Sequence, residues 1–428
     1  MEIRAANNSV GRASGDVRRH NRAVVLELIR TEGPISRAEL ARRTGLSAAA
    51  IMEITGRLCE EGLIREGGQG PSTGGRPPRL LELVDDARYA LGVEVGTRTL
   101  SAVLTDLRAR VKHRVLVPSR MAEGPEATYE QLRLALEEMN EGSLAKRGLI
   151  LGIGVAVPAP VVGSSGARFS PPSFPGWGEL DVGGRLEKEY GLPVLVDNDA
   201  NARAIGEHLF GVGQGIGEML YVICHRGVGG AIIMDGDMRR GARGGAGEIG
   251  HTMIDPDGPR CGCGRYGCLE AFVGRAAIAR RARKLMKLSG REELGRKPPE
   301  EIKAQDVVRA ALEGDALAQE VIRESGRYLG VGIANAVNAF DPELVVVGGS
   351  TAEAGELLLE PAREMVSKHA LEHAANRVRV VRGTLGEDAG AIGAAALVLR
   401  ELFAVSVTRM EPSAAEQLVT ETADSGEG

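Results

Sequence analysis

The chain has 428 residues, 43% of them hydrophobic, and a formal net charge of −5. This length predicts roughly two or three domains with sizeable apolar cores, and the acidic balance confines any DNA binding to a local patch. No run of about 18 apolar residues is present, so no membrane span is expected. The first residues lack the apolar stretch of a signal peptide, and five cysteines without a paired framework indicate a reducing, cytoplasmic location.

The N-terminal part of the chain predicts a short tail and a folded module. Residues 1–15 are polar and are expected to be disordered. Over residues 17–30, apolar side chains recur at helical spacing and predict a first helix. Two more helical segments follow, and then two strand-like runs flank a turn rich in glycine and proline, which predicts a β-hairpin wing.

Capping signals place the second and third helices. Ser36 and Glu39 form a capping box that starts the second helix, which ends at Gly45. Ser47 starts the third helix after a short turn. Because two helices joined in this way have helix-turn-helix spacing, residues 16–85 predict a winged helix-turn-helix that binds DNA. An αα-hairpin without a DNA-binding role is the alternative, and the wing argues against it.

Local charge favours DNA binding by this module. Residues 1–79 contain 13 arginines and no lysine against nine acidic residues. Arginines that bind phosphates set affinity and register, whereas the small side chains at the start of the third helix predict thin base readout. Arg76 in the wing either enters a narrow minor groove or stays solvated. The predicted DNA-contacting residues are Arg37, Ser47, Ala48, Ala49, Ala50, Met52, Arg57 and Arg76.

After the wing the pattern changes to apolar strands and helices arranged in two similar halves. Each half has a strand hairpin followed by helix–strand alternation, and a helix with the sequence GAIGAAALVLREL closes the second. This order fits an α/β, actin-like ATPase architecture of the ribonuclease H-like type over residues 88–404. The expected lobes are about 88–205 and 206–404. Residues 405–428 form an acidic tail that is expected to be disordered.

The segment 244–270 contains three of the five cysteines. His251, Cys261, Cys263 and Cys268 supply one nitrogen and three sulfur donors, the set of a closed tetrahedral zinc site. Glycines between the cysteines allow the tight turns that such convergence needs. A solvent-exposed loop with unpaired thiols is the alternative. Because four protein ligands leave zinc no open position, the ion is predicted to be structural, which argues against a zinc-dependent enzyme.

Carboxylates flank these ligands and a second polar pair precedes them in the chain. Glu248 and Glu270 are expected near the metal, and a metal-bound His251 would keep one ring nitrogen free to donate a hydrogen bond. Such a set suits a polyhydroxylated ligand, although each glutamate alone could simply be solvated. Asn198 and Asp199 follow a short strand where a helix begins, so Asp199 is either a helix cap or a catalytic base.

The segments GGAGEIGH and CGCGRYGCLE, together with VLVDNDANARAIGE, FPGW and VVVGGS, resemble the signature of the ROK family of sugar kinases and repressors. The likeness covers residues 88 to about 400 and implies the same actin-like fold. It also implies that Asp199 occupies the position of the base in the family's kinases. The sugar-binding residues that it implies are Asn198, Asp199, Glu248, His251 and Glu270.

The nucleotide side departs from the family pattern. Where ROK kinases have Asp-x-Gly-Gly-Thr, this chain has residues 94–98, EVGTR, and where they have Gly-Thr-Gly-x-Gly it has residues 225–229, HRGVG. Thr97 adds a Cβ where the backbone should approach phosphate. An arginine replaces threonine in both loops, and no GxxxxGK[ST] motif occurs, so no ATP binding is expected. Alternatively, Arg98 and Arg226 bind an anionic group of the effector.

Together these patterns predict a cytoplasmic, sugar-responsive transcriptional repressor of carbohydrate-metabolism genes. It would bind double-stranded operator DNA as a homodimer or homotetramer, without a membrane partner, and would hold a structural zinc ion. A sugar or sugar phosphate would lie between the lobes, with Asp199 as a vestige of the catalytic base. The alternative is an ATP-dependent sugar kinase with an accessory DNA-binding domain. The identity of the sugar, the operator and the direction of the response stay open.

Overall fold

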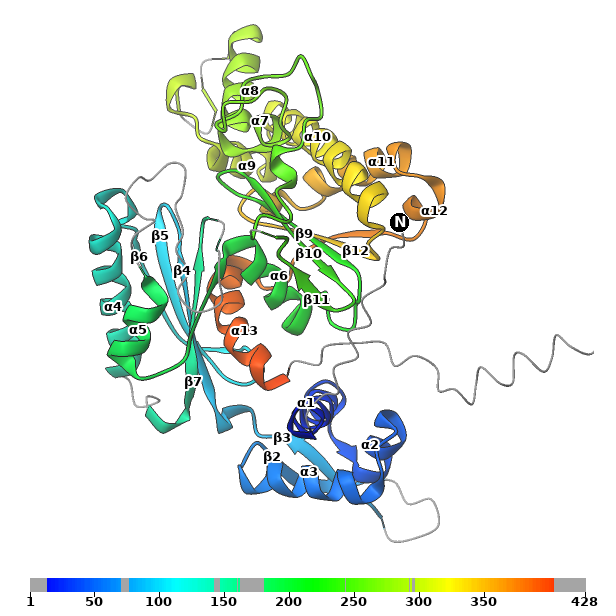
Figure 1. Cartoon of the computed structure of the whole chain (residues 1–428). Coiled ribbons are helices and arrows are strands. Elements are labelled where there is room, and N and C mark those ends of the chain that lie inside the picture. The colour runs from blue at the N-terminus through cyan, green and yellow to red at the C-terminus, as the bar shows by residue number, and fades with distance from the viewer. Residues whose placement is uncertain are drawn as a thin grey trace, which may run out of the picture.

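The computed structural model contains a small N-terminal module and two larger lobes (Figure 1). No helix in the described part of the chain is long and apolar enough to cross a membrane. Arg76, the motif FPGW, the predicted acidic tail and most of the predicted N-terminal tail lie outside the described residues. The structure describes residues 14–70, 77–141, 147–159, 161, 181–242, 244–291, 293–294 and 297–403.

The N-terminal module is the expected winged helix-turn-helix. Both predicted ends of its second helix are confirmed, because Ser36 Oγ accepts from the Glu39 amide at 3.2 Å and Gly45 has a φ of 69°. The short strand β1 was not predicted, since two residues show no alternation of apolar and polar side chains. The elements are α1 (Ser14–Glu32), β1 (Ile35–Ser36), α2 (Arg37–Thr44), α3 (Ala48–Glu60), β2 (Ile64–Gln69) and β3 (Arg79–Leu83), with the strands in the order β1-β3-β2.

The first lobe is built on a five-stranded sheet with the order β6-β5-β4-β7-β8. Strands β4, β5 and β6 are antiparallel neighbours, whereas β4, β7 and β8 are parallel. Helices α4 and α5 cover the outer face of this sheet (Figure 1). The elements are β4 (Tyr89–Val95), β5 (Thr99–Thr105), β6 (Val111–Pro118), α4 (Pro125–Glu141), β7 (Ile150–Val157), α5 (Val182–Tyr190) and β8 (Val194–Asn198).

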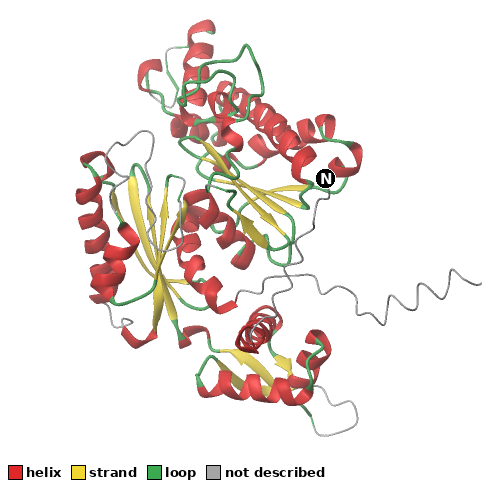
Figure 2. Ribbon diagram, viewed as in Figure 1, coloured by secondary structure: helices red, strands yellow, loops and turns green. Residues whose placement is uncertain are grey.

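The second lobe repeats this plan with the strand order β11-β10-β9-β12-β13. Again three antiparallel strands are followed by two parallel ones, so the predicted two-lobed architecture is confirmed (Figure 2). The strands are β9 (Met219–Cys224), β10 (Val228–Met234), β11 (Asp237–Arg239), β12 (Leu344–Gly348) and β13 (Arg379–Arg382). The helices are α7 (Glu270–Val273), α8 (Arg275–Leu288), α9 (Ala304–Leu312), α10 (Ala316–Phe340), α11 (Glu356–His369) and α12 (Glu372–Ala375).

Helices α6 (Asp199–Phe210) and α13 (Ala389–Phe403) lie between the two sheets (Figure 1). We expected the chain up to residue 404 to belong to the second lobe, but α13 packs on β4 and β7 of the first. The reason is the small size of the facing residues. A Cβ on Gly154 would lie 1.8 Å from the carbonyl oxygen of Ala394, so only glycine lets this helix approach the strand.

The N-terminal winged helix-turn-helix, from α1 to β3, is called the DNA-binding module below. It shares its apolar core with the first lobe. Val25 and Ile29 of α1 are fully buried, and they belong to the same cluster as Leu399 and Phe403 of α13. The predicted first helix therefore buries one face, which also includes the fully buried Leu26. Because burial of shared apolar surface resists separation, the module is packed on the first lobe rather than loosely tethered to it.

The Gly154→Ala substitution should destabilise the protein. The added methyl group would press on the backbone of α13, and overpacking of this kind costs about 1–3 kcal/mol or more of the free energy of unfolding. Urea unfolding of the full chain measures the change. Gly148→Ala is the control, because a Cβ there meets nothing within 4 Å. Equal stability of the two variants would contradict the close approach of α13.

Candidate functional site

The four predicted metal ligands converge in the second lobe. Their donor atoms all lie within 4.8 Å of one another. Cys261 Sγ is 3.7 Å from His251 Nδ1, and Cys263 Sγ is 3.7 Å from Cys268 Sγ. Two sulfurs bound to a tetrahedral zinc ion by bonds of about 2.3 Å are about 3.8 Å apart. The donor set and its spacing therefore fit such an ion.

The local fold of this loop explains the convergence. His251 ends the short 3-10 helix Ile249–His251, and Cys268 lies two residues before the start of α7. A β-bridge pairs Met253 with Cys268, which draws the histidine and cysteine segments together. Between the cysteines, Gly267 has a φ of 67°, as expected for a turn that glycine favours. The cysteine-rich segment is therefore a compact knuckle of the second lobe.

Glu270 connects this knuckle to the start of β10. One carboxylate oxygen lies 3.4 Å from Cys261 Sγ, and the other accepts from the Val228 amide at 3.1 Å. A Cβ on Gly227 would lie 2.0 Å from the same carboxylate. Gly227, one of the two glycines that remain in the second altered loop, therefore leaves room for Glu270. The predicted proximity of this glutamate to the metal ligands is present in the structure.

Asn198 and Asp199 share the start of α6. Asn198 is the N-cap, because its side-chain oxygen accepts from the Ala200 amide at 2.9 Å, so Asp199 is not the cap but the first helical residue. Burial, followed by the charge of Glu94, raises the pKa of Asp199 from 3.8 to about 6, and Glu248 adds to the rise. The negative charges of Glu94 and Glu248 therefore act on Asp199, which lies at the positive end of a helix.

The five predicted sugar-binding residues form two groups that meet at β10. Asn198, Asp199 and Glu248 make up one group, and His251 and Glu270 lie together at the metal ligands. Gly229, next to the Val228 amide that binds Glu270, faces Ala200 at the start of α6, since a Cβ there would lie 3.8 Å from the Ala200 Cβ. The loops that precede β10 and α7 thus bring the second group to the first.

Ion pairs that the sequence analysis missed surround this site. Arg240, just after β11, donates to the buried carboxylate of Asp197 at 2.6 Å and so connects the two lobes. Arg203 of α6 pairs with Glu94, and their side chains are only 9% and 16% exposed. The resemblance included Arg203 in a motif and Glu94 in an altered loop. No local signal, however, pairs residues 109 positions apart.

The exposed face of α3 agrees with the predicted DNA-contacting surface. Ala48 and Ala49 are exposed and Met52 is 58% exposed, whereas Ile51 is fully buried behind them. Ser47 is the N-cap of the helix, and its hydroxyl oxygen accepts from the Ala50 amide at 3.2 Å. Arg57, on the same helix, pairs with Glu53 at 2.8 Å and stays 60% exposed.

Arg37 has a different environment from the one we expected for a phosphate-binding residue. Its guanidinium donates to Thr55 Oγ1 at 3.0 Å and to Glu66 Oε1 at 2.8 Å. These bonds join α2 to α3 and to the wing, so the side chain holds the module together. The sequence alone does not show these bonds, because Thr55 and Glu66 lie 18 and 29 residues away from Arg37.

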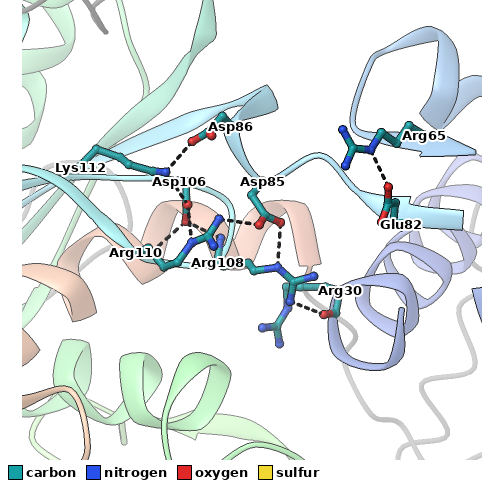
Figure 3. Close-up of polar contacts among 9 residues, drawn as sticks. All are labelled: Arg30, Arg65, Glu82, Asp85, Asp86, Asp106, Arg108, Arg110 and Lys112. Carbon is teal, nitrogen blue, oxygen red and sulfur yellow. Dashed lines mark hydrogen bonds and ion pairs between the residues drawn. The ribbon is translucent and has the colours of Figure 1, made fainter. Parts of the chain in front are cut away.

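A polar network joins the DNA-binding module to the first lobe (Figure 3). Asp85, between β3 and β4, accepts from Arg108 Nε at 2.7 Å and also pairs with Arg110. Arg108 in turn donates to the backbone oxygen of Arg30 in α1 at 2.8 Å. The side chain of Asp106 is fully buried and accepts from Arg110 Nε at 2.8 Å and Lys112 Nζ at 3.1 Å. These two cationic partners thus compensate the buried negative charge of Asp106.

Arg30 forms a second connection at the same boundary. Its side chain is 5% exposed and pairs with Glu27 on the same helix. The guanidinium lies 4.8 Å from the ring centre of Phe210 and 5.4 Å from that of Phe403, the last residues of α6 and α13. Such contacts between a cation and aromatic rings are attractive. Helix α6 therefore begins at Asp199 and ends against the DNA-binding module.

These features define a class of protein in which a winged helix-turn-helix is packed on duplicated actin-like lobes that carry a Cys3His cluster. The sequence pattern of the ROK family matches residues 90–401, and that of winged helix-turn-helix DNA-binding domains matches residues 19–65. The chain belongs to the ROK family. This result confirms the resemblance and both parts of the expected fold.

Individual relatives include regulators and a kinase. The N-acetylglucosamine repressor of Escherichia coli O6:H1 is 35% identical over 392 residues, 90% of this chain and 94% of that protein. A ROK family transcriptional regulator described as a homolog of the E. coli MLC protein superposes with a TM-score of 0.75 at 29% identity, covering 91% and 98% of the two chains. A ROK family glucokinase from Streptomyces griseus, solved with glucose and AMPPNP, gives 0.65 at 30% identity, covering 72% and 98%.

The Cys263→Ser substitution should release the metal ion from the purified protein. A hydroxyl is a poor replacement for a thiolate on zinc, and three remaining ligands would bind more weakly. Elemental analysis after dialysis measures metal per chain. Cys59→Ser is the control, because Cys59 lies in α3 of the DNA-binding module. A Cys263→Ser protein that keeps one zinc per chain would refute the ligand assignment.

The Asp199→Asn substitution should stabilise the protein at pH 7.5 more than at pH 4.5. Since the folded pKa of about 6 exceeds the ordinary 3.8, ionised Asp199 lowers stability above pH 6, and this penalty is lost as the pH falls toward 3.8. The amide cannot ionise and avoids the penalty throughout. Urea unfolding at both pH values measures the difference. The exposed Asp257→Asn should show no such dependence, and a pH-independent Asp199 effect would disprove the raised pKa.

Proposed function

We propose that this chain is a sugar-responsive transcriptional repressor that binds operator DNA. The observation that carries the proposal is the placement of α6, whose first residue lies in the predicted sugar site and whose last contacts Arg30 of the DNA-binding module. The similarity to an N-acetylglucosamine repressor over 90% of this chain supports the same function. The proposal includes a cytoplasmic location. It also includes assembly into a homodimer or homotetramer, because two-fold symmetric operators require paired DNA-binding modules.

The proposed sugar site uses the predicted residues in distinct ways. Asn198, Asp199, Glu248 and Glu270 would accept from or donate to sugar hydroxyls, and His251 would donate through the ring nitrogen that does not bind metal. Zinc, when bound, would supply a rigid fold to the loop that presents His251 and Glu270. The cluster has four protein donors, so zinc has a structural and not a catalytic role in this proposal.

The response to sugar would come from a change in the angle between the lobes. The residues proposed to bind sugar come from both lobes, and the ion pair of Arg240 with Asp197 connects the lobes. A sugar that binds the closed arrangement more tightly shifts the population toward it, whereas one that binds both equally changes nothing. Since the DNA-binding module is packed on the first lobe, closure would alter how paired modules are presented to DNA.

Loss of kinase activity is part of the proposal. Arg98 and His225 occupy loops that in ROK kinases follow a glycine- and threonine-containing pattern, and neither loop keeps that pattern. The second candidate is a sugar kinase, and one observation favours it. A pKa of about 6 for Asp199 suits a general base near neutral pH. The similarity to a glucokinase over 72% of this chain is consistent with either function.

Binding of DNA with and without sugars tests the proposal. The purified protein first selects a DNA duplex from a random library. Its affinity for that duplex should fall by roughly 5- to 150-fold when one sugar of a panel is added. Fluorescence anisotropy measures the dissociation constant. The Glu248→Gln protein should keep its DNA affinity and lose the response, while Glu372→Gln on the outer helix α12 should keep both (Figure 1).

Two results would contradict the proposal. If no duplex is selected, or if no neutral or phosphorylated sugar alters DNA binding, the chain is not a sugar-responsive regulator. If ATP with Mg²⁺ leads to phosphorylation of a hexose, the kinase candidate stands and the altered loops still bind nucleotide. A coupled assay for ADP release over the same sugar panel detects this second outcome.

A further inference from the structure

Two arginines from different lobes meet on one neutral acceptor. Arg98 lies in the turn between β4 and β5, whereas Arg275 is the first residue of α8 and Gln305 the second residue of α9, both in the second lobe. The side-chain oxygen of Gln305 accepts from Arg98 Nη1 at 3.3 Å and from Arg275 Nη2 at 2.6 Å. A single amide oxygen thus holds two like charges close together across the cleft.

This pair of positive charges lacks a carboxylate partner in the described part of the chain. Neither Arg98 nor Arg275 forms an ion pair there, whereas Arg281, further along the same helix α8, pairs with Glu324. Burial, and then the charge of Arg98, lowers the pKa of Arg275, and Glu353 opposes this shift. The two guanidinium groups repel one another, and a single amide oxygen satisfies few of their hydrogen-bond donors. An oxyanion is a stronger acceptor than an amide.

The surroundings add space and further hydrogen-bonding groups. A neighbouring pocket of about 300 Å³ is lined by polar and charged side chains and has Val308 and Leu312 on its apolar side. The polar and charged lining residues are Gln305, Arg309, Glu313, Ser350 and Glu353. His225 Nδ1 lies 2.9 Å from Ser350 Oγ. Burial, together with Arg275 and other nearby arginines, lowers the pKa of His225 to about 4, so the imidazole is neutral at pH 7. A neutral ring can accept one hydrogen bond and donate another.

The cluster is also continuous with the proposed sugar site. The charge of Glu94 acts on both His225 and Asp199, and Arg203 of α6 acts on both as well. The charges of Glu94 and Arg203 therefore act on both sites, with carboxylates near Asp199 and guanidinium groups near His225. A ligand with hydroxyls at one end and a negative charge at the other matches this division.

We propose that Arg98 and Arg275 bind an oxyanion, a phosphate or carboxylate group, between the two lobes. The oxyanion would replace Gln305 as the shared acceptor and make charge-assisted bonds to guanidinium groups from both sides. This inference rests on the proposed function in one respect: it assigns the effector to the class of acidic sugars, such as hexose phosphates or uronic acids. Binding of a free phosphate ion would use the same two residues.

Isothermal titration of the full-length, zinc-loaded protein tests this assignment at constant ionic strength. The ligands are a panel of neutral hexoses, the matching hexose 6-phosphates and uronic acids, and inorganic phosphate. We expect an acidic sugar to bind at least about tenfold more tightly than its neutral parent, because a hydrogen bond to a charged group contributes about 1.5–3 kcal/mol. Arg98→Gln and Arg275→Gln should each remove this preference while leaving the affinity of the neutral parent unchanged.

Matched variants separate the assigned contacts from general charge. Arg327→Gln on α10 removes an exposed arginine that pairs with Glu320, and it should leave the preference intact. Arg275→Lys keeps the charge but loses the planar pair of donors, so it should retain only part of the preference. Unchanged circular dichroism and zinc content show that each variant is folded.

The possible outcomes divide clearly. A preference for acidic sugars that both glutamine variants abolish supports the inference, as does binding of inorganic phosphate alone that both abolish. Equal affinity for neutral and acidic sugars, together with no phosphate binding, overturns it. A preference that survives in both variants also overturns it. If a neutral sugar alone shifts DNA binding, the inference fails while the proposed function stands.

Discussion

The close contact between α13 and the first sheet is the constraint on which the rest of the arrangement depends. Gly154 lets the last helix of the chain lie on a strand formed some 240 residues earlier, as its contact with Ala394 shows. Once α13 is seated there, it supports α6 on one side and buries Ile29 of α1 at its far end. The sheet, the helix that starts at the proposed sugar site and the DNA-binding module thereby become one packed body.

Charged groups with unfavourable electrostatic energy are concentrated at the proposed sugar and oxyanion sites. Asp199 is held near Glu94 and Glu248 with a raised pKa, and Arg98 shares a neutral acceptor with Arg275. At Asp106, by contrast, the buried carboxylate receives hydrogen bonds from both a backbone amide and a guanidinium. Groups that are unfavourable in the free protein and complementary to a ligand are common at binding sites. Stability and recognition therefore oppose one another in this cleft.

Sequence reasoning succeeded wherever the signal was local. The N-cap at Ser36, the apolar runs of the strands and the spacing of Cys261, Cys263 and Cys268 each fix a nearby geometry. The helices, the sheets and the clustering of the cysteine sulfurs could therefore be predicted. It failed where distant residues meet. The internal bonds of Arg37, the lobe to which α13 belongs and the role of Gln305 depend on tertiary packing that no short pattern encodes.

The position of Arg30 has a consequence for how an assembly would use lobe closure. Phe210 and Phe403 enclose its side chain and Arg108 holds its backbone, so the DNA-binding module cannot swing independently of the first lobe. Copies joined through their second lobes would convert a small closing angle into a change in the distance between the two α3 helices, with each first lobe acting as a lever arm. Copies joined through their first lobes would keep that distance fixed whatever the sugar did.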